Sequence, residues 1–184
     1  MSSGSNDDRA SASGSRNYAP VASAQGTAKN SIVKMTLDEN SILRRRPEVE
    51  HERAVALFDL LERNRFELSG EGAEAGPYHV NLALKEDRLV FSISSTEDRH
   101  IKDLSLPIRS FRSIIRDYFL ICESYFDAIK TMSPSQIEAI DMGRRSLHNE
   151  GAHLLEERLG ELVELDHPTA RRLFTLLCVL QMRG

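Results

Sequence analysis

The sequence contains no tryptophan and only two cysteines, and aromatic residues make up 6% of its 184 positions. Cys122 and Cys178 each lie in an apolar, helix-like stretch, and their spacing fits neither a disulfide framework nor a zinc set. The longest nearly uncharged apolar run, Leu173 to Met182, is about half of the ~20 residues that span a bilayer. The first residues lack the apolar core of a signal peptide. We therefore expect a cytoplasmic protein with no membrane partner.

The sequence also lacks an excess of positive charge. Its 24 lysines and arginines are outnumbered by 28 aspartates and glutamates, which gives a net charge of −4. Nucleic-acid binding needs a basic surface, and the longest arginine run, residues 44–46, is followed directly by Glu48, Glu50 and Glu52. This distribution argues against a nucleic-acid partner. A content of 40% hydrophobic and 28% charged residues is that of an ordinary globular protein.

The composition changes near residue 30. Residues 1–30 hold seven serines, six alanines and three glycines, and such a segment buries too little apolar surface to offset the entropy of ordering its backbone. We expect a disordered Ser/Ala/Gly-rich tail at 1–30 and a single globular domain at 31–184. A domain of that size needs no disulfide or metal to fold.

The hydrophobic period changes within the domain. Alternating apolar residues predict a short strand at Phe66–Leu68 and four longer strands that form a small antiparallel meander, near residues 32–37, 78–84, 89–94 and 101–106. A helix is predicted from Pro47, and from Pro107 onward the apolar residues follow the helical period. Strands followed by helices predict an α+β domain, in which the sheet packs against a layer of three to four helices.

The last predicted helix, Thr169 to Met182, is apolar on nearly every side and is preceded by Asp166 as its N-terminal cap. Two explanations compete. The favoured one is that the helix is buried inside the domain, because a chain of this size needs core material. The alternative is that one face stays exposed and forms a homodimer contact through this C-terminal helix.

Three polar residues of the segment 133–159 are the candidate site. With Ile140 at the centre of the apolar sector of the predicted helix, Asp141, Arg144 and His148 fall in or beside that sector. Charged groups that face a core must be paired. A structural network, with Arg144 paired to an acid of another element, is one interpretation. The other is a polar pocket, in which Arg144 binds an anionic group and His148 with Asp141 transfers protons.

His148 and His153 flank Glu150, but this is not a zinc-protease helix. That motif needs histidines four residues apart, whereas a spacing of five turns them about 140° from each other. Geometry places His153, with Arg145, Asn149, Glu156 and Glu157, on the solvent side of the helix. The alternative that one histidine binds a metal with residues from elsewhere stays open, and the sequence identifies no such set. We therefore predict no metal and no cofactor.

Gly143 and Gly151 are unusual inside a helix, where each costs about 1 kcal/mol relative to alanine. Both fall in the apolar sector. The simplest reason is the close approach of a neighbouring helix, and the rarer one is a ligand. They are eight residues apart and do not follow a strand, so they do not form a phosphate-binding loop.

No G-x-S-x-G turn or recognisable nucleophile is present either. The leading functional hypothesis is therefore a non-enzymatic binding or protein-interaction module. The alternative is a small enzyme that acts on an anionic small molecule with Asp141, Arg144 and His148. The ligand or protein partner cannot be named from the sequence.

Three blocks carry a resemblance to a known family: residues 50–59 (EHERAVALFD), residues 133–159 around IDMGRR, and residues 170–176 (ARRLFTL). Together they resemble the uncharacterised protein family numbered 0262 in the UPF series, small proteins of alphaproteobacteria. The resemblance covers about residues 31–184, and residues 1–30 look like an extension beyond it. It implies one bacterial cytoplasmic domain and assigns no role to any residue.

Overall fold

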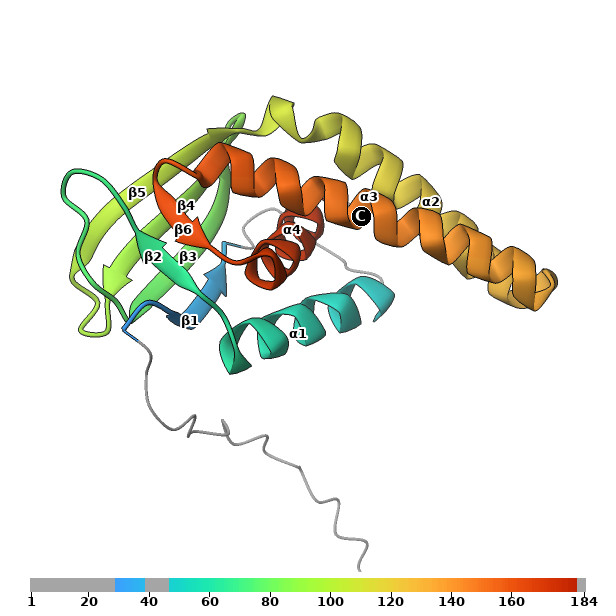
Figure 1. The fold of residues 1–184 in the computed structure, drawn as a ribbon, viewed down its shortest axis with the longest axis horizontal. Helices are drawn as coiled ribbons and strands as arrows, with labels where there is room; N and C mark the ends of the chain where they lie inside the picture. The colour runs from blue at the N-terminus through green and yellow to red at the C-terminus, as the bar shows by residue number, and fades with distance from the viewer. Residues whose placement is uncertain (1–28, 39–46, 182–184) are drawn as a thin grey trace, which may run out of the picture.

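A computed structural model describes residues 29–38 and 47–181 of the chain. Except for residues 29 and 30, the predicted tail 1–30 lies outside the described residues, and so does Met182 at the end of the last predicted helix. The described part combines a four-stranded sheet, a two-stranded sheet and four α-helices (Figure 1). The α+β class predicted from the sequence is confirmed.

The larger sheet has the strand order β1-β3-β4-β5. Its strands are the four predicted from alternation: β1 Ile32–Leu37, β3 Tyr78–Lys85, β4 Arg88–Ser95 and β5 His100–Pro107. Strands β3, β4 and β5 form the antiparallel meander that was predicted. Strand β1 differs, because it pairs parallel to β3, so the sheet is mixed. A parallel pair needs a long connection, and here that connection carries α1 and β2.

A smaller sheet consists of β2, Phe66–Leu68, and β6, Val163–Leu165, which pair antiparallel. Strand β2 was predicted and β6 was not. The phenol of Tyr78 joins the two sheets, since it accepts a hydrogen bond from the backbone N–H of Leu68 and donates one to the carbonyl of Glu74. The ring of Tyr78 also meets Phe66 edge to face, at 5.9 Å between centroids.

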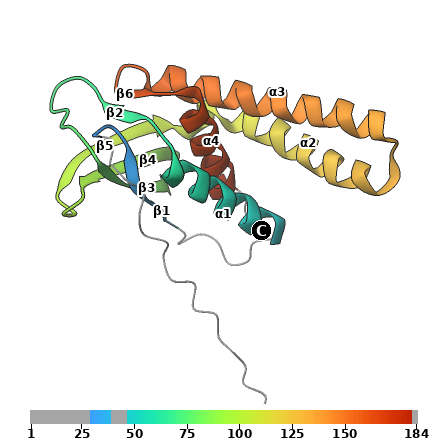
Figure 2. The same cartoon turned by 60° about the horizontal axis from the view of Figure 1, so that its bottom comes forward.

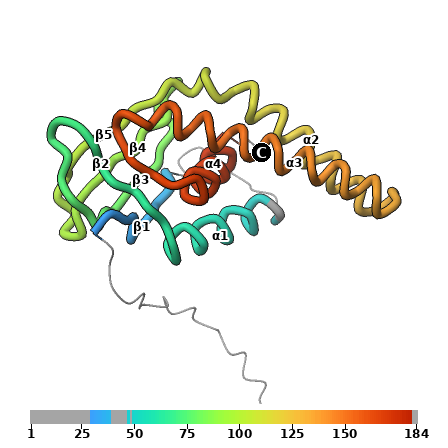
Figure 3. The backbone as a smooth tube through the Cα atoms, in the orientation of Figure 1, coloured from blue at the N-terminus to red at the C-terminus, as the bar shows by residue number. Residues whose placement is uncertain are grey.

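The helices are α1, Pro47–Glu62; α2, Arg112–Thr131; α3, Pro134–Leu159; and α4, His167–Gln181, with a short 3₁₀ turn η1, Ile108–Ser110, before α2. Helix α4 lies between α1 and α3 in the tube view (Figure 3). It begins two residues earlier than predicted. Asp166 caps it as expected, because its carboxylate accepts the backbone N–H of Thr169 at 3.0 Å.

Helix α4 supplies much of the core. From Leu173 to Leu180 every side chain except Thr175 is buried within the single chain. Burial inside the domain, the favoured explanation of this apolar helix, is therefore what the structure shows. Its described residues leave no exposed apolar face for the alternative, a homodimer contact through the C-terminal helix.

Helices α2 and α3 form a long antiparallel hairpin that projects from the body (Figure 2). The root of the hairpin packs into the core through residues such as Ile115, Leu155 and Leu159. Every residue from 119 to 147 is described, and Ala128 is the single buried one among them. We call residues 119–147 the distal arm. Its two helices pack against each other. At its base Phe119, Ile121, Cys122 and Leu147 also pack against the core, and toward the tip the views show no third element beside the hairpin.

Candidate functional site

The candidate residues predicted from the sequence all lie on α3, which starts at a well-formed cap. The backbone N–H and the hydroxyl of Ser133 both donate to the side-chain oxygen of Gln136, at 3.1 and 2.9 Å. Pro134 occupies the first turn, where its missing N–H costs nothing. This start fixes the helical phase, so the residues expected on the inner side can be compared directly with the structure.

Asp141 and Arg144 lie on the inner side of α3, as predicted, and they pair with each other. Arg144 donates from Nε and Nη2 to Oδ1 of Asp141, at 2.9 and 2.8 Å. Arg145 approaches the other carboxylate oxygen at 2.6 Å. The hydrogen bonds from Arg144, together with the charge of both arginines, lower the pKa of Asp141. The acid that pairs with Arg144 thus comes from the same helix, not from another element as expected.

The guanidinium of Arg144 also lies over the ring of Tyr125 on α2, with 5.3 Å between its central carbon and the ring centroid. A cation on the face of an aromatic ring is stabilised by the ring quadrupole. Arg144 therefore has an ionic partner on α3 and an aromatic partner on α2. Both partners hold it in the space between the two helices of the hairpin.

His148 is buried, with 8% of its surface exposed, and its partners differ from those of Arg144. Its Nε2 lies 2.8 Å from the hydroxyl of Thr175 on α4. The Thr175 hydroxyl donates its own hydrogen to the carbonyl of Arg171, so it accepts from His148. Nε2 therefore carries the proton, and Nδ1, which is buried, has no hydrogen-bond partner among the described residues.

The imidazole of His148 is enclosed by aromatic rings. Tyr118 of α2 and Phe174 of α4 lie 5.4 and 5.6 Å from it, centroid to centroid. Burial, reinforced by the positive charges of Arg171 and Arg144, lowers the pKa of His148 to about 4. At neutral pH this ring is uncharged.

The predicted trio is thus divided into two pairs. Asp141 with Arg144 forms an ion pair between the helices of the hairpin, and His148 with Thr175 forms a hydrogen bond to α4. Among the hydrogen bonds of the described residues, none joins His148 to the ion pair. The sequence thus predicted correctly which side of α3 these three residues occupy. The polar pocket that they were expected to share is not formed by direct contacts between them.

The two unusual glycines lie where other helices come closest. A Cβ on Gly151 would overlap the ring of Phe174 on α4, and a Cβ on Gly143 would lie 2.7 Å from Cδ1 of Ile121 on α2. The close approach of a neighbouring helix, the simpler of the two explanations, accounts for both positions.

Two surface cavities lie away from the trio. One, of about 300 Å³, lies on the outer face of the larger sheet, where Nδ1 of His79 is 2.8 Å from a carboxylate oxygen of Asp98. The other, of about 310 Å³, lies beside Arg112, Arg116 and Gln181. Neither is lined by Asp141, Arg144 or His148. The sheet cavity was not predicted, although most of its polar lining consists of the outward positions of strands whose inward positions were recognised, together with Asp98 of the turn between β4 and β5.

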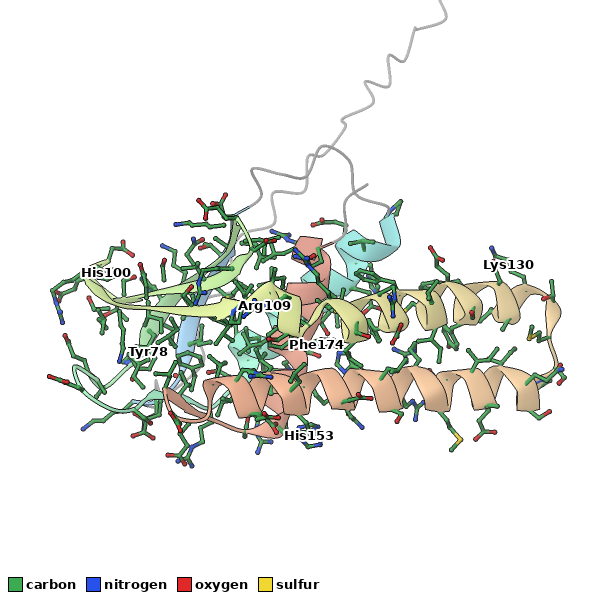
Figure 4. All side chains as sticks on the ribbon, turned by 90° about the horizontal axis from the view of Figure 1, so that it is seen from above. Tyr78, His100, Arg109, Lys130, His153 and Phe174 are labelled. Carbon is green, nitrogen blue, oxygen red and sulfur yellow. The ribbon has the colours of Figure 1, made fainter. Side chains whose placement is uncertain are left out.

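A cluster of polar side chains outside both cavities joins His153 and Glu156 of α3 with His167 of α4. The side chain of His153 faces solvent, as predicted, whereas Glu156, expected on the same side, is half-buried. In Figure 4 His153 lies at the root of the hairpin, far from Lys130 at its tip. The spacing of His153 and Glu156 is visible in the sequence, but the approach of His167 depends on how α4 packs.

Fold and site together define an α+β protein with a mixed four-stranded sheet, a helical layer around α4 and a projecting helical hairpin. Among the described residues, no helix combines the length and the apolar character needed to cross a membrane. The chain belongs to the uncharacterised protein family UPF0262, whose family model matches residues 29–183. The resemblance seen in the sequence is thereby confirmed.

Individual relatives cover most of the chain. A UPF0262 protein of Rhodospirillum rubrum is 58% identical over 153 residues, which are 83% of this chain and 93% of that protein. One of Paramagnetospirillum magneticum is 53% identical over 156 residues, 85% of this chain and 98% of its own. One of Jannaschia is 52% identical over 149 residues, 81% and 96% of the two chains. No solved structure matches the sequence.

Proposed function

We propose that this protein is a non-enzymatic protein-interaction module whose contact element is the distal arm, residues 119–147. The observation that carries the proposal is the exposure of large apolar side chains on an arm with one buried residue. Leu120, Ile129 and Met142 are 57%, 51% and 65% exposed, and Phe126 and Met132 are exposed as well. Of the eight exposed large apolar side chains among the described residues, five lie on this projecting element and three on α1. Exposed apolar surface of this kind is typical of a protein-binding site.

The arm presents this surface in a form suited to binding a helix. Phe126 and Ile129 are three positions apart on α2, so they lie side by side on one flank. A partner helix packed along that flank would supply the third layer that the arm lacks, the helix-in-groove mode of recognition. The partner would bury apolar side chains that water now surrounds, at a gain of roughly 25 cal/mol per Å².

The experiment compares the wild type with two double variants of equal design. Phe126→Ser with Ile129→Ser removes the apolar flank of the arm. Val55→Ser with Phe58→Ser makes the same change on α1, where both residues are also exposed and three positions apart. Each form is affinity-tagged in an alphaproteobacterial host, and the bound proteins are quantified by mass spectrometry.

We expect a defined protein to be lost with the arm variant and retained with the α1 variant. Titration calorimetry of that protein, purified, should then show a weakening of at least about tenfold, equal to 1.4 kcal/mol, for the arm variant alone. An identical set of bound proteins for all three forms would contradict the proposal. Light scattering of the same samples reveals whether the partner is a second copy of the chain.

The second candidate function is a small enzyme that acts on an anionic substrate, with Arg144 as anion binder and His148 and Asp141 as general acid and base. One observation favours it: the lone pair on buried Nδ1 of His148 has no partner among the described residues. Two observations weigh against it. Arg144 is already held by Asp141 and Tyr125, and a base with a pKa of about 4 is weak at neutral pH.

The two functions separate experimentally. A metabolite screen by thermal shift would identify a small anionic ligand, because a ligand that binds the folded state alone raises its stability. If the protein is an enzyme, His148→Ala abolishes turnover of that ligand. If it is an interaction module, the same change alters stability and leaves binding at the arm intact.

The proposal also includes a cytoplasmic location, supported by the two free cysteines, Cys122 and Cys178.

A further inference from the structure

Two histidines and one glutamate meet where α3 ends and α4 begins. His153 and Glu156 are three positions apart near the end of α3, and His167 is the first residue of α4. Nδ1 of His153 lies 3.0 Å from Oε2 of Glu156, and Nδ1 of His167 lies 2.7 Å from Oε1. The carboxylate of Glu156 therefore lies within hydrogen-bond distance of the Nδ1 atom of both histidines.

The spacing of these atoms suits a metal ion. All three ligand atoms lie within 4.8 Å of one another. Ligand atoms ~2.0–2.1 Å from a tetrahedral zinc ion are roughly 3.3 Å apart, so small side-chain rotations bring the set onto one ion. The centroids of the two imidazole rings are 4.4 Å apart, with 27° between their planes. The rings are therefore close neighbours, and they must rotate out of this stacked arrangement for both Nδ1 lone pairs to point at one ion.

The backbone that carries the ligands is held from several sides. Strand β6, between the two helices, is paired along its length with β2. Asp166 caps α4 directly before His167. The hydroxyl of Thr169, two residues after His167, accepts a hydrogen bond from the backbone N–H of Arg65 at 3.0 Å. His167 is therefore fixed relative to α3, and a site built on such elements loses little entropy when it binds an ion.

The local charge also favours a cation. Among the ion pairs of the described residues, Glu156 contacts the two histidines and no lysine or arginine. Its position in the last turn of α3 places it at the negative end of that helix dipole. The opposing N-terminus of α4 carries the carboxylate of Asp166 as its cap.

We propose that His153, Glu156 and His167 form a binding site for one divalent transition-metal ion, for which zinc is the probe used below. Two imidazoles and one carboxylate are ligands that zinc accepts readily, in contrast to the all-oxygen sets of calcium and magnesium. The three side chains leave the fourth coordination position to solvent, because His153 and His167 lie at the surface. This site is independent of the distal arm.

The test uses the full chain without a histidine tag and zinc chloride as the probe. Titration calorimetry at pH 7.5 should show one zinc ion bound per chain. His153→Ala and His167→Ala should each weaken this binding by more than the ~10–100-fold that loss of an outer-shell partner costs. His100→Ala is the matched control, because His100 also pairs with a carboxylate three residues away, Asp103, at 3.0 Å.

Two further measurements give the test independent readouts. Zinc should raise the thermal unfolding midpoint of the wild type and of His100→Ala, and leave that of His153→Ala unchanged. Binding should weaken at pH 5, because protons compete with the metal for imidazole. His153 is exposed, so its variant is expected to fold, and circular dichroism confirms this. Absence of one-to-one zinc binding, or equal affinity in wild type and His153→Ala, overturns the proposal.

Discussion

Replacement of Gly151 by alanine should destabilise the protein, although the same change stabilises most helices. In an exposed helix interior, Gly→Ala gains about 1 kcal/mol. Here the added methyl would overlap three atoms of the Phe174 ring, which lies directly over the α3 backbone. Phe174 is itself fully buried against Tyr118 and His148, so the ring has no free space to enter.

The magnitude follows from these opposing effects. Forcing an extra methyl into a packed core costs about 1–3 kcal/mol, and more where the neighbour cannot move. Phe174 has no free space to enter, so the cost lies toward the upper end, about 2–3 kcal/mol. After the gain of about 1 kcal/mol in helix propensity is subtracted, we expect a net loss of about 1–2 kcal/mol. At a slope of ~1–3 kcal/mol per M, this loss lowers the urea midpoint by roughly 0.3–2 M.

Gly143→Ala is the matched control on the same helix. Its methyl would meet only Cδ1 of Ile121, the far end of a flexible side chain that is partly exposed. Ile121 can rotate away, so we expect the propensity gain to dominate and the urea midpoint to rise slightly. The two substitutions are chemically identical, and the structure predicts opposite signs.

The same substitution in a second mutational background tests whether the ring of Phe174 causes the loss of stability. Phe174→Leu removes the ring, so Gly151→Ala should cost much less in that background than in the wild type, with a coupling of about 1 kcal/mol or more. If Gly151→Ala raises the midpoint as Gly143→Ala does, or if the coupling is zero, the assignment of Gly151 to helix–helix packing is wrong.

The remaining predictions concern pH, a hydrogen-bonded side chain and local opening. The folded-state pKa of His148, about 4, lies below the unfolded value of about 6.5, so its contribution to stability is complete above pH 6.5 and is lost as the pH falls toward 4. From pH 7 to 5 the free energy of unfolding in urea should fall less in His148→Leu than in the wild type, by an amount of order 1–2 kcal/mol. Asn64→Ala should cost about 2 kcal/mol in urea unfolding, because this amide bonds the N–H and the carbonyl of Ile32 as well as the carbonyl of Leu60. Asn149→Ala should cost less, because Asn149 of α3 is partly buried and its side-chain oxygen has no hydrogen-bond partner among the described residues. In hydrogen exchange, amides of residues 119–147 should open before those of α4, because Ala128 alone is buried in the arm. Equal protection of arm and α4 would contradict the view that the arm is held less firmly than the core.

Much of the sheet could be predicted because its strands are buried on one side. In β4, for example, buried Leu89, Phe91 and Ile93 alternate with more exposed residues, and this period is legible in the sequence. The direction of β1 was not legible, since the side-chain pattern of a strand is the same whichever way its neighbour runs. Strand β6 has the same length and the same apolar–polar–apolar pattern as β2. It was missed because it lies between two helical segments and its partner β2 lies almost a hundred positions earlier.

The candidate site was also predicted only in part, because a sequence shows local geometry and does not show which distant elements pack together. Helical geometry placed Asp141, Arg144 and His148 on the inner side of α3, since the phase of one helix is a local property. Their partners are not local in the same way. The hydroxyl that bonds His148 comes from α4, and the aromatic ring beneath Arg144 comes from α2. The meeting of His153 and Glu156 with His167 likewise depends on the turn through β6.

Helix α3 shows what an irregular helix sequence can and cannot reveal. An ordinary amphipathic helix would have apolar residues at the positions of Gly143, Arg144, His148 and Gly151. Each departure coincides with a contact: the glycines with Ile121 and Phe174, and the polar residues with groups on α2, α3 or α4. An apolar side chain in place of either glycine would push a neighbouring helix away, and an unpaired charge at Arg144 would be costly to bury. The irregular positions therefore mark where other elements touch α3, and the fold is needed to identify those elements.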